Sequence, residues 1–386
     1  MKNGWQTRTL GEVCVIKPPK SEARKRVAAT AMVSFAPMED LGVDQKFFTA
    51  TQVKPLGTVI GSYTYFGDGD VLLAKITPCF ENGKLGIAAD LSNGIGFGSS
   101  EFMVLRPDPR LDREFLYYFL ARPEFRTEGA ARMGGAVGQQ RVPKEFIESY
   151  RIPVPPFADQ QRIVGILDEA FAGIATAKAN AEKNLQNAST LFKSQLQSVF
   201  TLRGGEWVET TIDQISTNLD SNRVPITKNV RTSGTYPYYG ASGIVDYVGD
   251  YIFEGDTLLV SEDGANLLAR STPIAFSVTG KYWVNNHAHI LKFQNMATQR
   301  FVEFYLESIK LDEYITGTAQ PKLNQKALNS IPIPIPRAIE AQARIVESIE
   351  SLREETRRLK SIYGQKLAML EALKKSLLHL AFSGNL

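Results

Sequence analysis

The chain has 386 residues, of which 43% are hydrophobic and 22% charged, and its formal net charge is +3. This length suits two or three domains, and the composition is that of a soluble globular protein. With two cysteines and three scattered histidines, a disulfide framework is disfavoured and a four-cysteine zinc site is excluded, so we expect no metal and no cofactor. The mild positive charge does not by itself indicate nucleic acid.

The sequence carries no membrane or export signal. No apolar run is long enough to cross a bilayer, and residues 1–10 lack the apolar segment of a signal peptide. We therefore expect a cytoplasmic location.

The first part of the chain is predicted to form short strands joined by loops. It is rich in glycine, aromatic and β-branched residues, and turn signals such as Phe66-Gly67-Asp68-Gly69 interrupt it. The segment Gly94–Gly98 has three glycines but no strand–turn–helix frame, so we interpret it as a loop and not as a nucleotide-binding turn. A short aromatic helix is predicted around Arg113–Leu120.

A proline-rich strap and a long helix follow. The strap is Ile152-Pro153-Val154-Pro155, and each proline removes a backbone donor and favours extended backbone before it. No proline occurs from Val164 to Phe200, which predicts a long helix, and the carboxylate of Asp159 near its start favours the helix dipole.

The second half of the chain repeats this order. Gly69-Asp70-Val71-Leu72-Leu73 recurs as Gly255-Asp256-Thr257-Leu258-Leu259, and an aromatic helix is predicted around Arg300–Ile309. The strap recurs from Ile333, with one extra residue between Pro336 and Gln342, and a second proline-free stretch runs from Val346 to Phe382. A repeat of this length indicates a domain duplication.

The two long helices carry complementary apolar seams. The seam of the first helix is rich in alanine and that of the second is rich in leucine, so we expect the helices to pack on each other as a coiled coil. The predicted seams are Ile163, Leu167, Ala170, Ile174, Ala177, Ala181, Asn184, Ala188 and Leu191 in the first helix, and Ile345, Ile349, Leu352, Thr356, Leu359, Tyr363, Lys366, Leu370, Leu373, Leu377 and Leu380 in the second.

Two strap-plus-helix segments, each following a β-rich domain that opens near a tryptophan, resemble the specificity subunit of type I restriction–modification systems. The resemblance covers essentially the whole chain. It implies an α+β fold in which two β-rich α/β target-recognition domains are separated by two long helices, packed as an antiparallel coiled coil in a pseudo-two-fold repeat. The implied boundaries are 1–150 and 205–331 for the recognition domains, and 151–204 and 332–386 for the straps with their helices.

The resemblance also implies a non-catalytic DNA-binding subunit. Its expected partners are double-stranded DNA and two methyltransferase subunits, and a restriction subunit is left open. In the first domain, the stretches Ala74–Lys84 and Gly138–Val142 are similar to motifs of one class of recognition domain. In the second, Tyr239–Ile244, Asp263–Asn266, Val284–His289 and Gln320–Asn324 are similar to another class or correspond in position.

The residue types in these stretches suit DNA recognition, because Gln, Asn, Arg and Lys pair with base edges or hold phosphates. For any single residue a turn-forming role is the simpler interpretation, and Glu81 or Asp263 could simply cap a turn. For each loop as a whole we favour DNA contact. The candidate DNA-binding residues are Lys75, Thr77, Asn82, Lys84, Gln139, Gln140, Arg141, Tyr239, Ser242, Asn266, Asn286, His287, Gln320 and Lys322.

His287 and His289 alternate as on a strand and are expected to face one side. No Cys, Asp or Glu follows at ligand spacing, which disfavours a metal pair and leaves a DNA contact or a structural histidine. Motifs for amino-methyl transfer, a P-loop and a common nuclease core are absent. An enzyme with unrecognised motifs and a coiled-coil scaffold with no DNA role remain the alternatives, and the target sequence is not legible.

Overall fold

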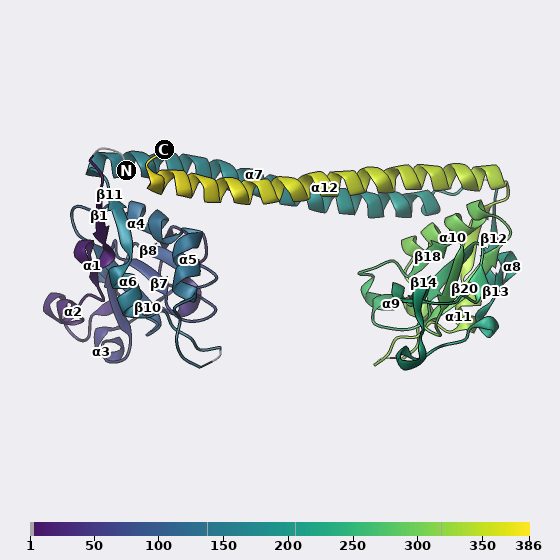
Figure 1. The fold of residues 1–386 in the computed structure, drawn as a ribbon, viewed down its shortest axis with the longest axis horizontal. Helices are drawn as coiled ribbons and strands as arrows, with labels where there is room; N and C mark the ends of the chain where they lie inside the picture. Colours follow the sequence, from purple (N-terminus) through teal and green to yellow (C-terminus); the bar gives the residue numbers. More distant parts are fainter. Residues whose placement is uncertain (1–3, 137, 205, 318) are drawn as a thin grey trace. The chain divides into compact units, whose positions relative to one another are not determined.

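A computed structural model describes residues 4–136, 138–204, 206–317 and 319–386 (Figure 1). The chain forms two compact units, one of residues 1–180 with 366–386 and one of residues 181–365. Two helices of 45 residues, α7 (Phe157–Thr201) and α12 (Ile339–Ser383), each begin in one unit and end in the other. The α+β class with two long helices is therefore confirmed. None of the helices in the described part of the chain is apolar enough over a sufficient length to span a membrane.

Unit 1 contains two main sheets, of strand order β2-β10-β7-β8-β4 and β5-β3-β9-β6. Its strands are β1 (Gln6–Thr9), β2 (Cys14–Ile16), β3 (Met32–Ala36), β4 (Phe47–Phe48), β5 (Gln52–Pro55), β6 (Thr64–Gly67), β7 (Val71–Ala74), β8 (Leu85–Ala88), β9 (Ile95–Gly98), β10 (Phe102–Pro107) and β11 (Arg151–Val154). Its short helices are α1 (Leu10–Val13), α2 (Ser21–Arg26), α3 (Leu56–Val59), α4 (Arg113–Leu120), α5 (Pro123–Ala130) and α6 (Lys144–Ser149).

The prediction that Gly94–Gly98 forms a loop is wrong, because residues 95–98 form the buried strand β9. This strand pairs with β3 on one side and β6 on the other. A Cβ added at Gly96 would lie 2.2 Å from the ring of Phe66, and one at Gly98 would lie 2.4 Å from the carbonyl of Ala36. The glycines therefore make room for neighbouring groups within a sheet, which local sequence does not reveal.

Unit 2 contains two four-stranded sheets, of order β13-β20-β17-β18 and β15-β14-β19-β16. Its strands are β12 (Trp207–Thr211), β13 (Ser216–Asn218), β14 (Ser233–Gly240), β15 (Gly243–Val248), β16 (Phe253–Glu254), β17 (Thr257–Ser261), β18 (Ala275–Val278), β19 (Lys281–Val284), β20 (Ala288–Phe293) and β21 (Pro332–Pro336). Its short helices are α8 (Ile212–Ile215), α9 (Asn266–Ala269), α10 (Met296–Ser308) and α11 (Gln325–Asn329).

Each strap is an extended strand, as the prolines predict. β11 pairs antiparallel with β1 and β21 pairs antiparallel with β12, so the start of each β-rich region is tied to its end. Each pair is a two-stranded sheet, in which a strand needs hydrogen bonds on one side only and tolerates proline. The long helices begin directly after the straps, and Asp159 and Glu340 lie in their first turns, so Asp159 is near the helix start as predicted.

Within each unit, the start of one long helix and the end of the other share one hydrophobic core with the aromatic helix. In unit 1, Phe382 stacks edge-on against Phe115 and Phe119 of α4. In unit 2, Phe200 packs in the same way against Phe301 and Tyr305 of α10. The helix segments in each unit therefore run antiparallel, and the repeat extends to individual core contacts.

The predicted seam of α7 holds as far as Ala181 and again at the buried Ala188, but Asn184 and Leu191 depart from it. Asn184 is exposed and Leu191 is 54% exposed, whereas Leu185 and Phe192 are partly buried and Leu196 is buried. An α-helix with 3.6 residues per turn drifts away from a strict seven-residue repeat, so the buried stripe moves to neighbouring positions along the helix.

A buried glutamine joins strap to helix in each unit. The amide nitrogen of Gln160 donates to the carbonyls of Pro155 and Arg110, and its oxygen accepts from the backbone amide of Asp112. In unit 2, Gln342 donates to the carbonyl of Pro336 and accepts from the hydroxyl of Thr298. Both glutamines thus anchor the turn between strap and helix.

Candidate functional site

In unit 1, the two predicted motif stretches lie side by side. The loop that follows β7 runs antiparallel to residues 140–142, because Thr77 N donates to the carbonyl of Gln140 and Val142 N donates to that of Lys75. Arg141 is the centre of this arrangement. Its backbone exchanges hydrogen bonds with Gly134 and forms a bridge with Ile76.

The side chain of Arg141 is held by Glu101. Its Nε and Nη2 donate to the two carboxylate oxygens, each at 2.9 Å, and its Nη1 donates to the carbonyl of Gln139. The hydrogen bonds from Arg141 lower the pKa of Glu101. Lys75 lies 3.8 Å from the same carboxylate and donates to the carbonyl of Ser100. Two candidate cations therefore share one carboxylate.

The remaining candidate residues of unit 1 differ in their exposure and in the hydrogen bonds of their side chains. Asn82 and Gln139 are exposed, and Gln140 is half-buried. The hydroxyl of Thr77 donates to Glu81, and Lys84 donates to the carbonyl of Met38. These two contacts give Thr77 and Lys84 structural roles in addition to the predicted one.

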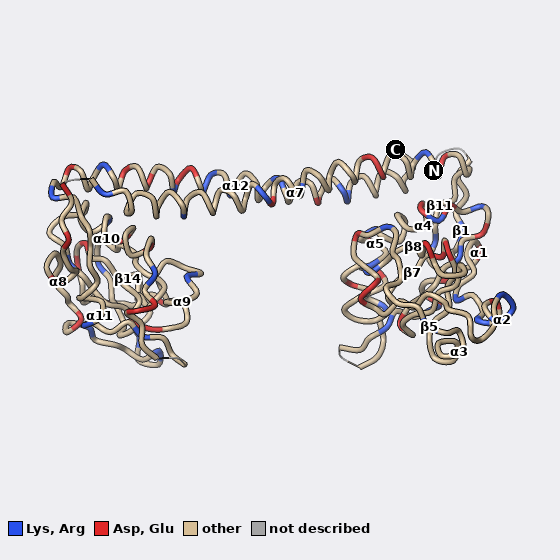
Figure 2. Tube along the Cα trace, turned by 180° about the vertical axis from the view of Figure 1, so that it is seen from behind, with Lys and Arg blue, Asp and Glu red and all other residues tan. Residues whose placement is uncertain are grey.

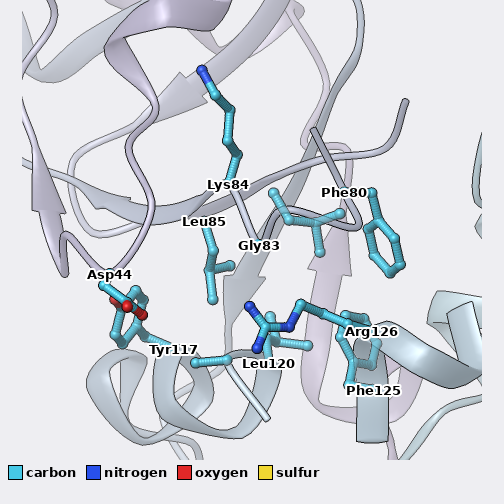
Figure 3. Close-up of a pocket in the computed structure, with 11 residues that line it drawn as sticks. Asp44, Phe80, Gly83, Lys84, Leu85, Tyr117, Leu120, Phe125 and Arg126 are labelled. Carbon is cyan, nitrogen blue, oxygen red and sulfur yellow. The ribbon is translucent and has the colours of Figure 1, made fainter. Parts of the chain in front are cut away.

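The loop covers a small cavity between Gly83 and helices α4 and α5 (Figure 3). The guanidinium of Arg126 points into this cavity, whereas Lys84 points away from it (Figure 3). The cavity measures about 20 Å³, which suits one water molecule. It is too small for a nucleobase or cofactor, so the chemistry of this region lies on its outer surface.

Unit 2 repeats the backbone arrangement of unit 1. Gly264 N donates to the carbonyl of Pro321, and Leu323 N donates to that of Glu262. Lys322 exchanges backbone hydrogen bonds with Thr316 and forms a bridge with Asp263. Lys322 therefore occupies the place of Arg141, in agreement with the correspondence expected from sequence.

Several candidate residues of unit 2 lie near the backbone bridge between Lys322 and Asp263. The Nζ of Lys322 lies 3.2 Å from Glu262, and the Nδ1 of His287 lies 2.9 Å from Asp263. Ser242, Asn286 and Gln320 are exposed. The stretch that starts at Tyr239 joins the group because Tyr239 accepts from Asn285 N and Ser261 donates to the carbonyl of Ala241.

Two candidates of unit 2 have clear structural roles. The Oδ1 of Asn266 accepts from Ser271 and from Thr272 N, so this side chain closes its own turn. The ring of Tyr239 packs against Phe276 and Tyr282, and burial raises the pKa of its hydroxyl.

The two histidines have different surroundings, although the sequence predicted one shared side. His287 is exposed and precedes β20, whereas His289 is 1% exposed within that strand. The Nδ1 of His289 lies 2.5 Å from Asp220 and its Nε2 lies 2.7 Å from the carbonyl of Leu323. Both ring nitrogens of His289 thus face oxygen atoms inside the protein.

Asp220, Glu262 and His289 bring three possible ligand atoms within 4.8 Å of one another, from distant parts of the sequence. Arg223 fills this cluster, because its guanidinium lies 2.6 Å from Glu262 and 3.6 Å from Asp220. Burial would raise the pKa values of both carboxyls, but the hydrogen bond with His289 lowers that of Asp220 and the hydrogen bond from Arg223 lowers that of Glu262. The cluster is an internal network in which Arg223 and His289 contact both carboxylates.

Glu101 and a basic segment around α2 were not among the residues predicted from the motifs. Glu101 lies outside both motifs, and only the fold brings it to Arg141. Arg24 and Lys25 are exposed on α2, which Figure 2 shows as a basic segment, while Arg26 donates to the carbonyls of Asn93 and Gly94. The charge run Arg24-Lys25-Arg26 was a signal that could have found this segment.

These features define a class of protein. Two β-rich units, each joined to two long helices, carry matching polar loop sites with exposed amide and cationic side chains. In the described part of the chain, the loop sites contain neither a nucleophile–base pair nor a cavity for a reacting substrate. This arrangement suits recognition of a macromolecule by two related domains.

The chain belongs to the family described as type I restriction modification DNA specificity domain, which it matches twice, over residues 2–186 and 204–364. Among curated relatives, the type I restriction enzyme EcoEI specificity subunit of Escherichia coli is 39% identical over 166 residues, 43% of this chain and 27% of that protein. The EcoAI specificity subunit of the same organism is 36% identical over 165 residues, 42% of this chain and 27% of that protein. The matched part is therefore about a quarter of each relative.

Two solved structures share the fold along the whole chain. One comes from work described as the structural basis of complex assembly and conformational transition of the type I R-M system, with a TM-score of 0.79 and 17% identity, covering 100% of this chain and 99% of that one. The other is the HsdS subunit from Thermoanaerobacter tengcongensis, with a TM-score of 0.67 and 18% identity, covering 100% of this chain and 98% of that one. At these identities the likeness concerns the fold alone.

Proposed function

We propose that this chain reads a DNA sequence made of two unlike half-sites and performs no chemistry itself. Residues 1–150 would read one half-site and residues 205–331 the other, through the candidate loops described above. Because the proposed ligand is chromosomal DNA, the proposal keeps the cytoplasmic location expected from sequence.

One observation carries this proposal. The same backbone arrangement places Arg141 in unit 1 and Lys322 in unit 2, while the side chains around these cations differ between the units. Base edges are distinguished by their patterns of hydrogen-bond donors and acceptors. Two domains with the same backbone arrangement but different polar side chains are therefore suited to reading two different base sequences.

The partners follow from the duplicated helices. Each unit presents the start of one strap-and-helix segment and the end of the other, with equivalent core contacts. We propose that these two equivalent surfaces dock two methyltransferase subunits, which would bind the methyl donor. Native mass spectrometry of the chain with excess methyltransferase partner would show a two-to-one complex, and saturation at one-to-one contradicts this part.

The DNA proposal is tested by sequencing the methylome of cells that express this chain with its methyltransferase partner. A split motif with unlike halves is expected. Arg141→Ala should relax the first half only and Lys322→Ala the second half only, while Lys144→Ala on α6, which pairs with Glu148, should leave both halves unchanged. A continuous or fully palindromic motif contradicts the proposal.

Two alternatives have distinct signatures. Methyl transfer or DNA cleavage by the purified chain alone would indicate an enzyme. A scaffold with no DNA role would show no salt-dependent preference for any duplex, because phosphate contacts make DNA binding weaken as salt increases.

A further inference from the structure

A carboxylate holds the central cation of each candidate site, Arg141 in unit 1 and Lys322 in unit 2. The residue that supplies this carboxylate occupies a different position in each unit. Lys75 and Glu262 are equivalent, because the amides of Val142 and Leu323 donate to their carbonyls. In unit 2 the residue at this position, Glu262, supplies the carboxylate itself. In unit 1 a lysine occupies that position, and Glu101, in the turn directly before β10, supplies the carboxylate instead.

We propose that Glu101 and Glu262 are positioning residues that aim Arg141 and Lys322 at a guanine edge, one in each half-site. The inference rests on the proposed function and deepens it, because it names the base feature that each unit reads. Guanine offers two neighbouring acceptors, N7 and O6, in the major groove, and these are the usual partners of Arg and Lys.

The donor count of Arg141 supports this assignment. A guanidinium has five N–H donors, and Glu101 and the carbonyl of Gln139 accept three of them. Two donors remain for a ligand. Because the side chain is fixed on two sides, it presents these donors in one orientation, which suits a base edge better than the many positions that phosphates occupy.

The negative charge of Glu101 has a second effect. A free arginine on an exposed loop would bind any phosphate, and such contacts carry no sequence information. A carboxylate 2.9 Å from the guanidinium offsets its charge and repels phosphates that approach the pair. Glu101 should therefore weaken binding to unrelated DNA while it strengthens the reading of one base.

The decisive variant is Glu101→Gln, which keeps the shape of the side chain and removes its charge. We would measure binding of the chain with its methyltransferase partner to the duplex selected by the wild type from random DNA, and to a scrambled duplex, at several salt concentrations. The ratio of the two affinities should fall about tenfold. Glu145→Gln, an exposed carboxylate on α6, is the matched control and should leave the ratio unchanged.

A second measurement identifies the base feature. Each guanine of the selected duplex is replaced in turn by 7-deazaguanine, which lacks the N7 acceptor. For the wild type, one replacement in the first half-site should weaken binding, and in Glu101→Gln the same replacement should have a smaller effect. Because Glu262 also holds Arg223, unit 2 is tested with Lys322→Met, which should remove sensitivity to one replacement in the second half-site.

The possible results distinguish failure of this inference from failure of the proposed function. A wild-type preference that Glu101→Gln leaves intact overturns this inference alone. Equal loss of affinity for both duplexes together with a lower Tm also overturns it, since the role of Glu101 is then structural. A wild-type complex with no preference between duplexes overturns the proposed function and this inference together.

Discussion

Gln160 allows a quantitative test of how strap and helix are joined. Its side chain is fully buried and makes three hydrogen bonds, to the carbonyls of Pro155 and Arg110 and from the amide of Asp112. Gln160→Leu keeps the volume but leaves three backbone groups without this partner. Each buried unpaired group costs about 1–3 kcal/mol. Because Arg110 lies at the surface and its carbonyl can regain water, we expect a net loss of about 3–4 kcal/mol.

The same reasoning predicts an order among three variants. Gln342→Leu removes two hydrogen bonds, one of them to a hydroxyl that can rotate, so the expected loss in unit 2 is about 1–3 kcal/mol. Gln161→Leu makes the same chemical change at the exposed neighbour of Gln160 and should change stability by less than about 0.5 kcal/mol.

Urea denaturation must be followed separately in each unit, because the two units need not unfold together. Unit 1 can be followed by alkylation of its buried thiol at Cys14, and unit 2 by tryptophan fluorescence in a Trp5→Phe variant, which keeps Trp207 and Trp283. If the urea midpoint of unit 1 is the same for Gln160→Leu and Gln161→Leu, the hydrogen bonds of Gln160 do not hold the strap on the helix.

Three further predictions concern unit 1. Burial raises the pKa of Cys14 to about 12, whereas the unfolded thiol ionises near 9.0, so unit 1 should lose stability as pH rises between these values, and Cys14→Ala should reduce that loss in urea titrations at pH 8 and pH 10. Gly96→Ala should cost about 2–3 kcal/mol in urea titrations because its Cβ would meet the ring of Phe66, whereas Gly61→Ala, with open space around it, should cost much less. Asp70→Asn should cost about 3–5 kcal/mol, because Asp70 is 1% exposed and its carboxylate makes a two-point ion pair with Arg106; an unchanged Tm would contradict this.

The sequence predicted the repeated parts of the molecule well, because they depend on local signals. Helix α4 has the predicted bounds, α10 begins four residues earlier than predicted, and both straps are extended as their prolines require. The failures concern contacts between distant segments. Residues 95–98 were interpreted as a loop because nothing near them in the sequence shows that the ring of Phe66 lies over Gly96.

In the candidate sites too, local signals predicted the positions of the loops, but contacts between distant residues could not be predicted. Gln139–Arg141 and Gln320–Lys322 could be matched from the repeat alone, and the backbone bridges agree with that match. What sequence could not supply is the acceptor for each cation. Glu101 is 40 residues from Arg141, and Glu262 is 60 residues from Lys322 and lies just before the stretch Asp263–Asn266. A repeat can preserve where a cation stands while the carboxylate that orients it changes position. For this reason, alignment of the two halves identifies the corresponding loops, but only the three-dimensional contacts identify which charges within them are free to meet DNA.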